Sequence, residues 1–301
     1  MPPSLLPVPH FPSLLASWLD ALASIDSIQE VLVLTGRPED TNAIDLAIES
    51  SGTMFANSAG AILDRADHRG TAGALRDVVL DRSIENRILL VEGTSMPAGN
   101  LASIFDPGIE DESVEGVFAR TDSSEPAGAL LLKARAFDLV PEVGFFDLKE
   151  QLLPRVIEQE KKILVRSVGA ETIRLTQPED YLDLVRALGR RGDSTRSTGP
   201  WIHPNAQVDP SAIIGENVLI DEGVQVGPGS IIQRSVLLKG AQVGSDALIA
   251  RSIVRPNLQI APKARLIDSD EVLLDARGTW SRNATRTPFA ISKPPLAGTG
   301  S

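Results

Sequence analysis

A six-residue repeat constrains the fold of this chain more than any other feature. From residue 202 an aliphatic side chain recurs at every sixth position, at Ile202, Val208, Ile214, Ile220, Val226, Ile232 and Leu238. Four residues after each of the first six stands a small or β-branched residue, namely Ala206, Ala212, Val218, Val224, Ser230 and Val236. An ordinary strand or helix does not have this period. It is typical of a hexapeptide-repeat parallel β-helix, in which the aliphatic side chain points into a narrow prism.

The repeat continues after a slip of one residue. It resumes beyond Leu238 at Val243, Ile249, Val254, Ile260 and Leu266. About eleven hexads make three to four coils. We therefore predict a short left-handed parallel β-helix over residues 201–270.

The first 189 residues follow another pattern, in which short apolar runs alternate with helical periodicity. The predicted strands are residues 30–36, 86–93 and 128–134, and the predicted helices are residues 14–23, 40–49, 72–81 and 148–159. Alternation of this kind favours an α/β, Rossmann-like domain with a mostly parallel sheet and helices on both faces. Residues 190–200 are rich in Gly, Ser and Thr and are predicted to be a linker, and residues 271–301 a tail without periodicity.

Two helix starts carry capping-box spacings. Asp147 is followed three residues later by Glu150, and Thr176 is followed by Pro178 and Glu179. The simplest role of the charged residues Asp147, Lys149 and Glu150 is therefore capping and compensation of the helix dipole.

Composition excludes several classes of function. The net charge of −11 argues against a protein that binds nucleic acid or an anionic membrane. The chain has no Cys, so disulfides, thiolate metal sites and a Cys nucleophile are excluded. The apolar N-terminus lacks the basic region of a signal peptide, and no apolar run reaches transmembrane length. We expect a cytoplasmic protein without a membrane span.

Segments along the chain resemble the sugar-1-phosphate nucleotidyltransferases, above all mannose-1-phosphate guanylyltransferase-like and glucose-1-phosphate nucleotidyltransferase-like members with a β-helical C-terminal part. The resemblance is carried by "LLPVPHFPSLLASWLDAL" (5–22), "EVLVLTG" (30–36), "GTAGAL" (70–75), "GFFDLKEQLLPRV" (144–156) and "LTQPEDYLDLVRAL" (175–188). It implies the reaction of an NTP with a sugar 1-phosphate to give a nucleotide sugar and pyrophosphate, assisted by Mg²⁺.

The "GTAGA" stretch is the most specific part of this resemblance. In the family such a loop lies against the nucleotide base, and its small residues let the backbone approach the ligand. The resemblance therefore implies a nucleotide or nucleotide-sugar site made by Gly70, Thr71, Ala72, Gly73 and Ala74. A tight turn that leads into a helix is the alternative interpretation.

The phosphate-binding loop, the two Mg²⁺ carboxylates and the sugar-phosphate lysine that the family uses are not matched in this sequence. Its Gly-rich loop for the triphosphate precedes the segment that aligns with residues 4–8, so we expect the loop to be missing. Thr94 stands where the resemblance places one Mg²⁺ carboxylate, with Glu92 two residues away, and Arg174 stands where it places the other. An arginine cannot ligate Mg²⁺. A sugar-phosphate lysine is absent from "SSEPAG" (123–128), which retains Glu125 and Pro126.

Three hypotheses follow. The first is a degenerate family member that binds a nucleotide sugar or NTP, or a partner subunit through its β-helix as a homo- or hetero-oligomer, in a regulatory or scaffolding role. The second is an active nucleotidyltransferase that uses Mg²⁺. The third is a hexapeptide acyltransferase, for which the only histidine in the repeat half is His203. His10, His68 and His203 have no ligand spacing, so no histidine metal site is expected.

Overall fold

The computed structural model describes residues 3–55, 58–63, 69–97, 99–105, 111–169, 172–189 and 199–268. The chain divides into two compact units. The α/β unit takes its described residues from 2–5 and 13–174. The β-helix unit takes them from 6–12 and from residue 175 onward. Each unit is described below by itself.

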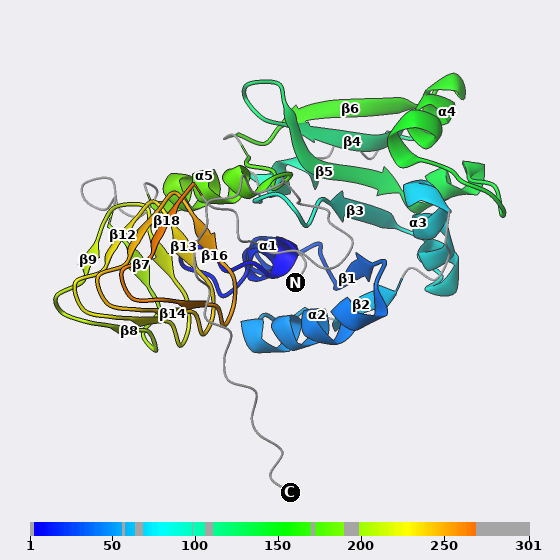
Figure 1. The fold of residues 1–301 in the computed structure, drawn as a ribbon. Coiled ribbons are helices and arrows are strands. Elements are labelled where there is room, and N and C mark those ends of the chain that lie inside the picture. Colours follow the sequence, from blue (N-terminus) through cyan, green and yellow to red (C-terminus); the bar gives the residue numbers. More distant parts are fainter. Residues whose placement is uncertain are drawn as a thin grey trace, which may run out of the picture. The chain divides into compact units, whose positions relative to one another are not determined.

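The α/β unit contains four α-helices and six strands among its described residues, and about half of these elements lie where the aliphatic patterns predict them (Figure 1). The helices are α1 (Leu14–Ala23), α2 (Pro38–Ser51), α3 (Gly70–Asp81) and α4 (Leu153–Glu158). The strands are β1 (Glu30–Thr35), β2 (Ser58–Leu63), β3 (Arg87–Val91), β4 (Val114–Arg120), β5 (Pro126–Lys133) and β6 (Lys162–Ser167). Helices α1, α2 and α3 and strands β1, β3 and β5 match predicted segments to within a few residues.

The strands of this unit form two sheets, and the larger one is mixed rather than mostly parallel. Strands β1 and β2 make a two-stranded parallel sheet. The other sheet has the order β3-β5-β4-β6, in which β5 is antiparallel to both of its neighbours and only β4 and β6 are parallel. The alternation of strands and helices had suggested parallel pairing, but the short β4–β5 connection forms an antiparallel hairpin instead.

Strands β2, β4 and β6 were not predicted. Strand β2 reads "SAGAIL" and strand β4 reads "VEGVFAR", so each contains a glycine that weakens the strand signal. In β4 this glycine is required by packing, because a Cβ on Gly116 would collide with the carbonyl oxygen of Leu131 in the neighbouring strand. Strand β6 follows directly on the charged end of α4, where we had expected helix to Gln159.

Asp147 caps its helix as predicted. Its Oδ1 accepts the backbone N–H groups of Lys149 and Glu150 at 2.7 and 2.9 Å. The reciprocal bond comes from Gln151, whose Oε1 accepts the Asp147 N–H at 2.7 Å, and not from Glu150. The segment that follows is a π-helical turn (Leu148–Leu152) that leads into α4.

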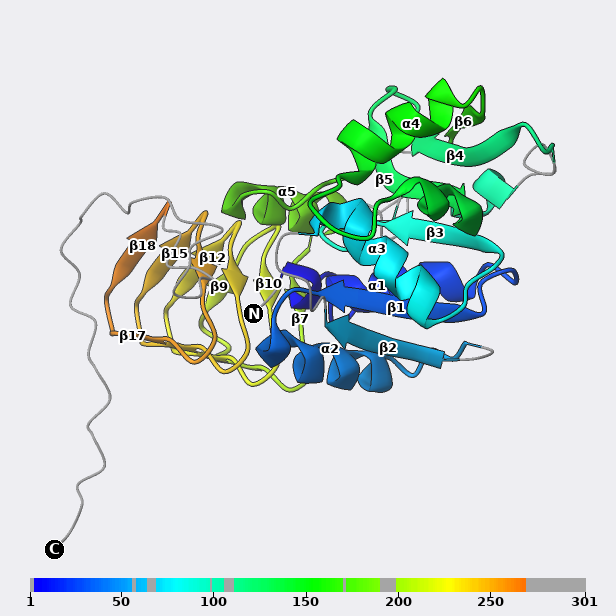
Figure 2. The same ribbon diagram turned by 90° about the vertical axis from the view of Figure 1, so that its right-hand side faces the viewer.

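The repeat half winds through three parallel sheets in rotation, with strands β7 to β18 (Figure 2). These strands are Trp201–Ile202, Gln207–Val208, Ile213–Ile214, Leu219–Ile220, Gln225–Val226, Ile231–Gln233, Val236–Leu237, Gln242–Val243, Leu248–Ala250, Ile253–Val254, Gln259–Ile260 and Arg265–Ile267. Every third strand joins the same four-stranded sheet. This is the strand order of a parallel β-helix with three faces per coil.

The slip of the repeat lies one position earlier than predicted. Ile220 pairs with Leu237, and Leu237 pairs with Val254, so Leu237 and not Leu238 continues the inward series. Leu237 belongs to the core of the prism together with Ile232 and Val243. Leu238 is fully buried as well, and because both residues are leucines the sequence alone does not distinguish them.

Helix α5 (Pro178–Gly189) groups with the β-helix unit, whereas we had expected it to close the first domain. Its start is capped by Asp180, whose Oδ2 accepts the backbone N–H groups of Thr176 and Gln177; the predicted partner was Glu179. Residues 190–198 of the predicted linker, residues 269–270 and the predicted tail lie outside the described residues. No described helix has the length and apolarity to cross a membrane.

Candidate functional site

The candidate site lies where β3 ends, in the loop of residues 92–95. Its backbone is fixed by an antiparallel bridge between Ser95 and Arg174, and by the Met96 N–H, which donates to the Ile173 carbonyl at 3.1 Å. On the other side, the Glu92 N–H donates to the Gly128 carbonyl at 2.8 Å. Gly128 has a φ of +71°, and a Cβ there would lie 2.8 Å from the Ser95 hydroxyl. Positions 94 and 174, which the sequence pairs only by resemblance, are thereby brought close together.

Glu92 is held by two cations. Its Oε2 lies 2.7 Å from an Arg174 guanidinium nitrogen, and its Oε1 lies 2.8 Å from the Lys149 ammonium. The Glu92 side chain is about one-third exposed (32%). These three residues, which we call the Glu92 cluster, come from three separate segments and carry a net charge of +1.

The Glu92 cluster does not fit a Mg²⁺ ion. Magnesium requires oxygen ligands, commonly one or two carboxylates. Both oxygens of Glu92 are engaged by cations, Arg174 offers no ligand atom, and Thr94 offers only an exposed hydroxyl. Across the described residues, no group of three or more His, Asp and Glu is placed to hold a metal.

The "GTAGA" stretch forms the first turn of α3 and packs against backbone. The N–H groups of Ala72 and Gly73 both donate to the Phe146 carbonyl, at 3.0 and 3.2 Å. Gly70 has a φ of +71°, and a Cβ on it would lie 2.7 Å from that same oxygen. The bare backbone is thus required for a close approach by residues 144–147. The ligand role of Gly70 to Ala74 stays a prediction. The N–H groups of Ala72 and Gly73, which such a role would use, already donate to the Phe146 carbonyl.

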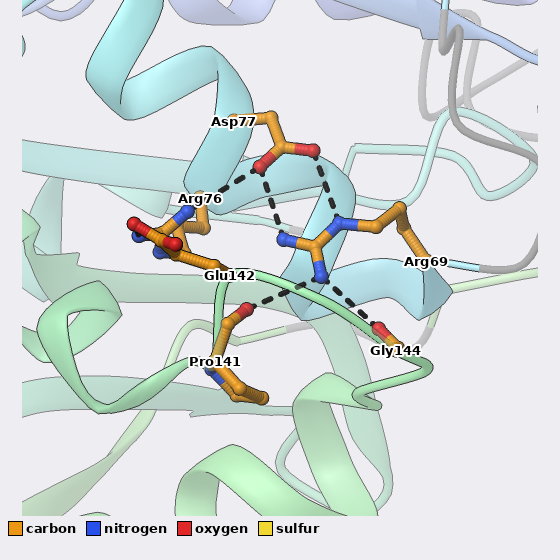
Figure 3. A network of polar contacts seen from close by, with 6 residues as sticks. All are labelled: Arg69, Arg76, Asp77, Pro141, Glu142 and Gly144. Atoms are coloured by element: carbon orange, nitrogen blue, oxygen red, sulfur yellow. Dashed lines mark hydrogen bonds and ion pairs between the residues drawn. The ribbon is translucent and has the colours of Figure 1, made fainter.

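A buried arginine beside this turn was missed in the sequence (Figure 3). Arg69 makes a bidentate ion pair with Asp77 of α3 and donates to the carbonyls of Pro141 and Gly144. Its side chain is only 10% exposed. The guanidinium therefore ties the start of α3 to residues 141–144. Nothing in the spacing of Arg69 and Asp77 reveals the two carbonyls, which lie more than 70 positions away in the chain.

Asp147 lies next to the first turn of α3 as well. Its Oδ2 is 3.5 Å from the Thr71 hydroxyl, at the limit of a hydrogen bond. The Glu150 N–H, which Asp147 accepts, lowers the pKa of the Asp147 carboxyl below its ordinary value against the opposing effect of burial. The Asp147 carboxylate therefore caps a helix, and a ligand role for it stays a prediction.

One cavity of about 1750 Å³ connects these groups. Its wall includes Gly70, Thr71, Ala74, Glu92, Thr94, Asp147 and Lys149, whereas Ala72, Gly73 and Arg174 do not line it. The remaining predicted residues lie elsewhere: Glu125 is exposed in the β4–β5 turn and Pro126 begins β5, while His10 and His203 lie in the β-helix unit. His68 falls outside the described residues.

Comparison with known proteins finds similarity in part of the chain. Residues 198–275 match the family model described as the GMPPB C-terminal domain. A relative from Arabidopsis thaliana named "Probable mannose-1-phosphate guanylyltransferase 2" is 29% identical over 116 residues, which cover 37% of this chain and 31% of that protein. The match thus spans about a third of the relative. Both findings support a relationship to the sugar-1-phosphate nucleotidyltransferases.

Proposed function

We propose that this chain is a sugar-1-phosphate nucleotidyltransferase relative that binds a nucleotide sugar without efficient nucleotidyl transfer, in a regulatory or scaffolding role. The β-helix, left-handed in this proposal, would supply the surface for homo- or hetero-oligomers. The match of residues 198–275 and the similarity to a guanylyltransferase relative support the family part of the proposal.

The state of Glu92 supports the loss of transfer. Attack of a sugar phosphate on an NTP brings two anions together, and a metal ion commonly neutralises them. Here the only carboxylate beside Thr94 in the 92–95 loop is already neutralised by Arg174 and Lys149. A fixed guanidinium and ammonium suit the binding of a diphosphate, to which both donate charge-assisted hydrogen bonds. They do not by themselves replace a metal ion that bridges the two reacting phosphates.

A thermal-shift series with GDP-mannose, UDP-glucose and ADP-glucose tests the binding half. We expect at least one of them to stabilise the protein equally in EDTA and in Mg²⁺, by about 2.7 kcal/mol at a hundredfold excess over its dissociation constant. Arg174→Ala should weaken this stabilisation. Lys161→Ala is the matched control, because the Lys161 ammonium donates to the Glu112 carbonyl away from the 92–95 loop. Stabilisation that requires Mg²⁺ would contradict the proposal.

An active nucleotidyltransferase is the second candidate, favoured by the name of the matched relative. Incubation with Mg²⁺, each NTP and mannose 1-phosphate distinguishes it, with pyrophosphate release as the readout. We expect no release above a protein-free control. Turnover at about 1 s⁻¹ or faster, the ordinary range for enzymes, would replace the proposal with this alternative.

A further inference from the structure

Beyond the Glu92 cluster, the cavity of the α/β unit continues as a slot between two strands. Every residue of β1 (30–35) and of β3 (87–91) contributes to its wall. Strand β1 pairs with β2 and strand β3 pairs with β5, and within the described part of the chain each is the edge strand of its sheet. Figure 2 shows the arrows of β1 and β3 pointing in the same direction. The slot is thus bounded by two strand edges of the same orientation.

The sequences of these two strands are those of central strands. Strand β1 contains "VLVL" and strand β3 contains "ILL", and near-continuous aliphatic runs of this kind are typical of strands buried on both faces. Yet all residues of both strands except Thr35 are only partly buried. Strand β5, which has a neighbour on each side, is buried over six consecutive residues. The exposure of β1 and β3 therefore follows from a missing neighbour.

The two faces of the slot are already covered by helices. Helix α1 contributes Leu15, Trp18, Leu19 and Leu22, and helix α3 contributes Ala74, Leu75, Val78 and Val79. Figures 1 and 2 together show α1 and α3 on opposite sides of the strands. What the arrangement lacks is the layer between these helices, at the position of one strand.

We propose that this slot receives a β-strand of five or six uncharged aliphatic residues, which runs parallel to β1 and β3 and hydrogen-bonds to both. Backbone N–H and C=O groups along two strand edges need partners at the repeat of a strand, and a compact ligand cannot supply them. The aliphatic side chains of α1 and α3 would then bury both faces of the inserted strand.

Charge and sequence specify the occupant further. The wall between the ends of the slot, residues 31–35 of β1 and 88–91 of β3, has no charged side chain, so a charge on the inserted strand would be desolvated without a partner. Charged residues stand at its ends: Glu30, Glu85 and Arg87 at one, Glu92, Asp147 and Lys149 at the other. The segments outside the described residues contain no run of five uncharged residues free of Pro and Gly. No segment outside the described residues therefore supplies this strand, and the described aliphatic runs are already paired in their own sheets, so the occupant is a strand of a partner chain.

Hydrogen exchange with a synthetic peptide tests this inference. The probe is five aliphatic residues flanked by two lysines at each end, added to the purified chain of residues 1–301. We expect exchange to slow by about tenfold or more in residues 31–35 and 88–91 together. The same peptide with the backbone amides of all five aliphatic residues methylated keeps its side chains but cannot donate a hydrogen bond to either strand edge, and should protect neither strand.

A pair of variants on α3 supplies the second readout. Val78→Lys places a charge on the wall of the slot and should abolish the protection, whereas Leu80→Lys changes a side chain that is 54% exposed and does not line it, and should leave the protection intact. If Val78→Lys fails to fold, the comparison of the methylated and unmethylated peptides on the wild-type chain still tests the proposal.

Three results would overturn the inference. Protection of one strand alone, or equal protection by the methylated peptide, would mean that the peptide binds at an edge or through side chains only. Absence of protection would mean that the slot does not accept a strand. Faster exchange in β1 and β3 after removal of residues 269–301 would show that the slot is filled from within the chain.

Discussion

At the scale of the residue, Gly70 explains why the backbone is bare before α3. A Cβ at this position would lie 2.7 Å from the Phe146 oxygen, and the φ of +71° is unfavourable for any other residue. We therefore expect Gly70→Ala to lower the free energy of unfolding by about 1–3 kcal/mol, measured by urea denaturation. Gly36→Ala is the control, since nothing lies within 4 Å of its Cβ. Equal effects of the two variants would contradict this explanation.

Arg69 is a second residue whose role only the fold reveals. Lysine at this position keeps the charge but cannot make the bidentate pair with Asp77 and also reach the carbonyls of Pro141 and Gly144. We expect Arg69→Lys to cost about 2 kcal/mol of stability. Arg82→Lys alters an exposed pair with Glu30 and should change stability by less than about 0.5 kcal/mol. If urea unfolding showed that Arg69→Lys and Arg82→Lys lower the free energy of unfolding equally, the buried Arg69 guanidinium would have no special role.

Sequence spacing identified local partners of residues and missed distant ones. The cap at Asp147 was predictable because its partners follow within three residues. At α5 the predicted Glu179 was wrong, because Asp180 stands next to it and both spacings allow a cap. The partners of Glu92 lie 57 and 82 positions away, so only the fold shows that its charge is neutralised.

At the scale of the element, the cap at Asp147 gives the turn before α4 a dependence on pH. Because the pKa of Asp147 is lowered in the folded state, its contribution to stability is present above the ordinary value of 3.8 and is lost as the pH falls through the folded value. Asp147→Asn keeps a good capping residue but removes the titration. The stability difference between wild type and Asp147→Asn should therefore disappear in acid, measured by urea unfolding from pH 7 to pH 2. A difference that stays constant across this range would contradict the assignment.

The β-helix, whose aliphatic residues recur at a fixed interval, could be predicted from the sequence, whereas the pairing of the strands in the α/β unit could not. The hexads identified the β-helix because each coil repeats the same contacts at a fixed interval. The division of the α/β strands into two sheets depends instead on which edges meet, and no local pattern contains that information. Strands β2 and β4 were missed for a local reason, since each contains a glycine that lowers the strand signal, and in β4 this glycine serves close packing against Leu131.

At the scale of the whole molecule, the β-helix unit is discontinuous in sequence, because residues 6–12 belong with residue 175 and beyond. One buried hydrogen bond joins the two pieces: the Tyr181 hydroxyl of α5 donates to the Pro7 carbonyl at 2.5 Å. Tyr181→Phe leaves that carbonyl without its partner and should cost about 1–2 kcal/mol of stability. Urea unfolding followed by circular dichroism measures this loss, and a neutral effect would show that the segment is held by its apolar contacts alone.

The ionisation of Tyr181 at high pH shows whether the β-helix unit is still folded. Burial raises the pKa of the Tyr181 phenol well above its ordinary value, and the negative charge of Asp221 adds to the effect. The unfolded chain ionises this group first, so the stability it contributes is present below pH 10 and is lost as the pH rises beyond it. Tyr181 is the only tyrosine of the chain, so its ultraviolet difference absorbance reads this site alone. We expect phenolate to form together with loss of the circular dichroism signal as the pH rises. Phenolate that forms in the folded protein near pH 10 would show instead that residues 6–12 separate from α5 while the β-helix remains intact.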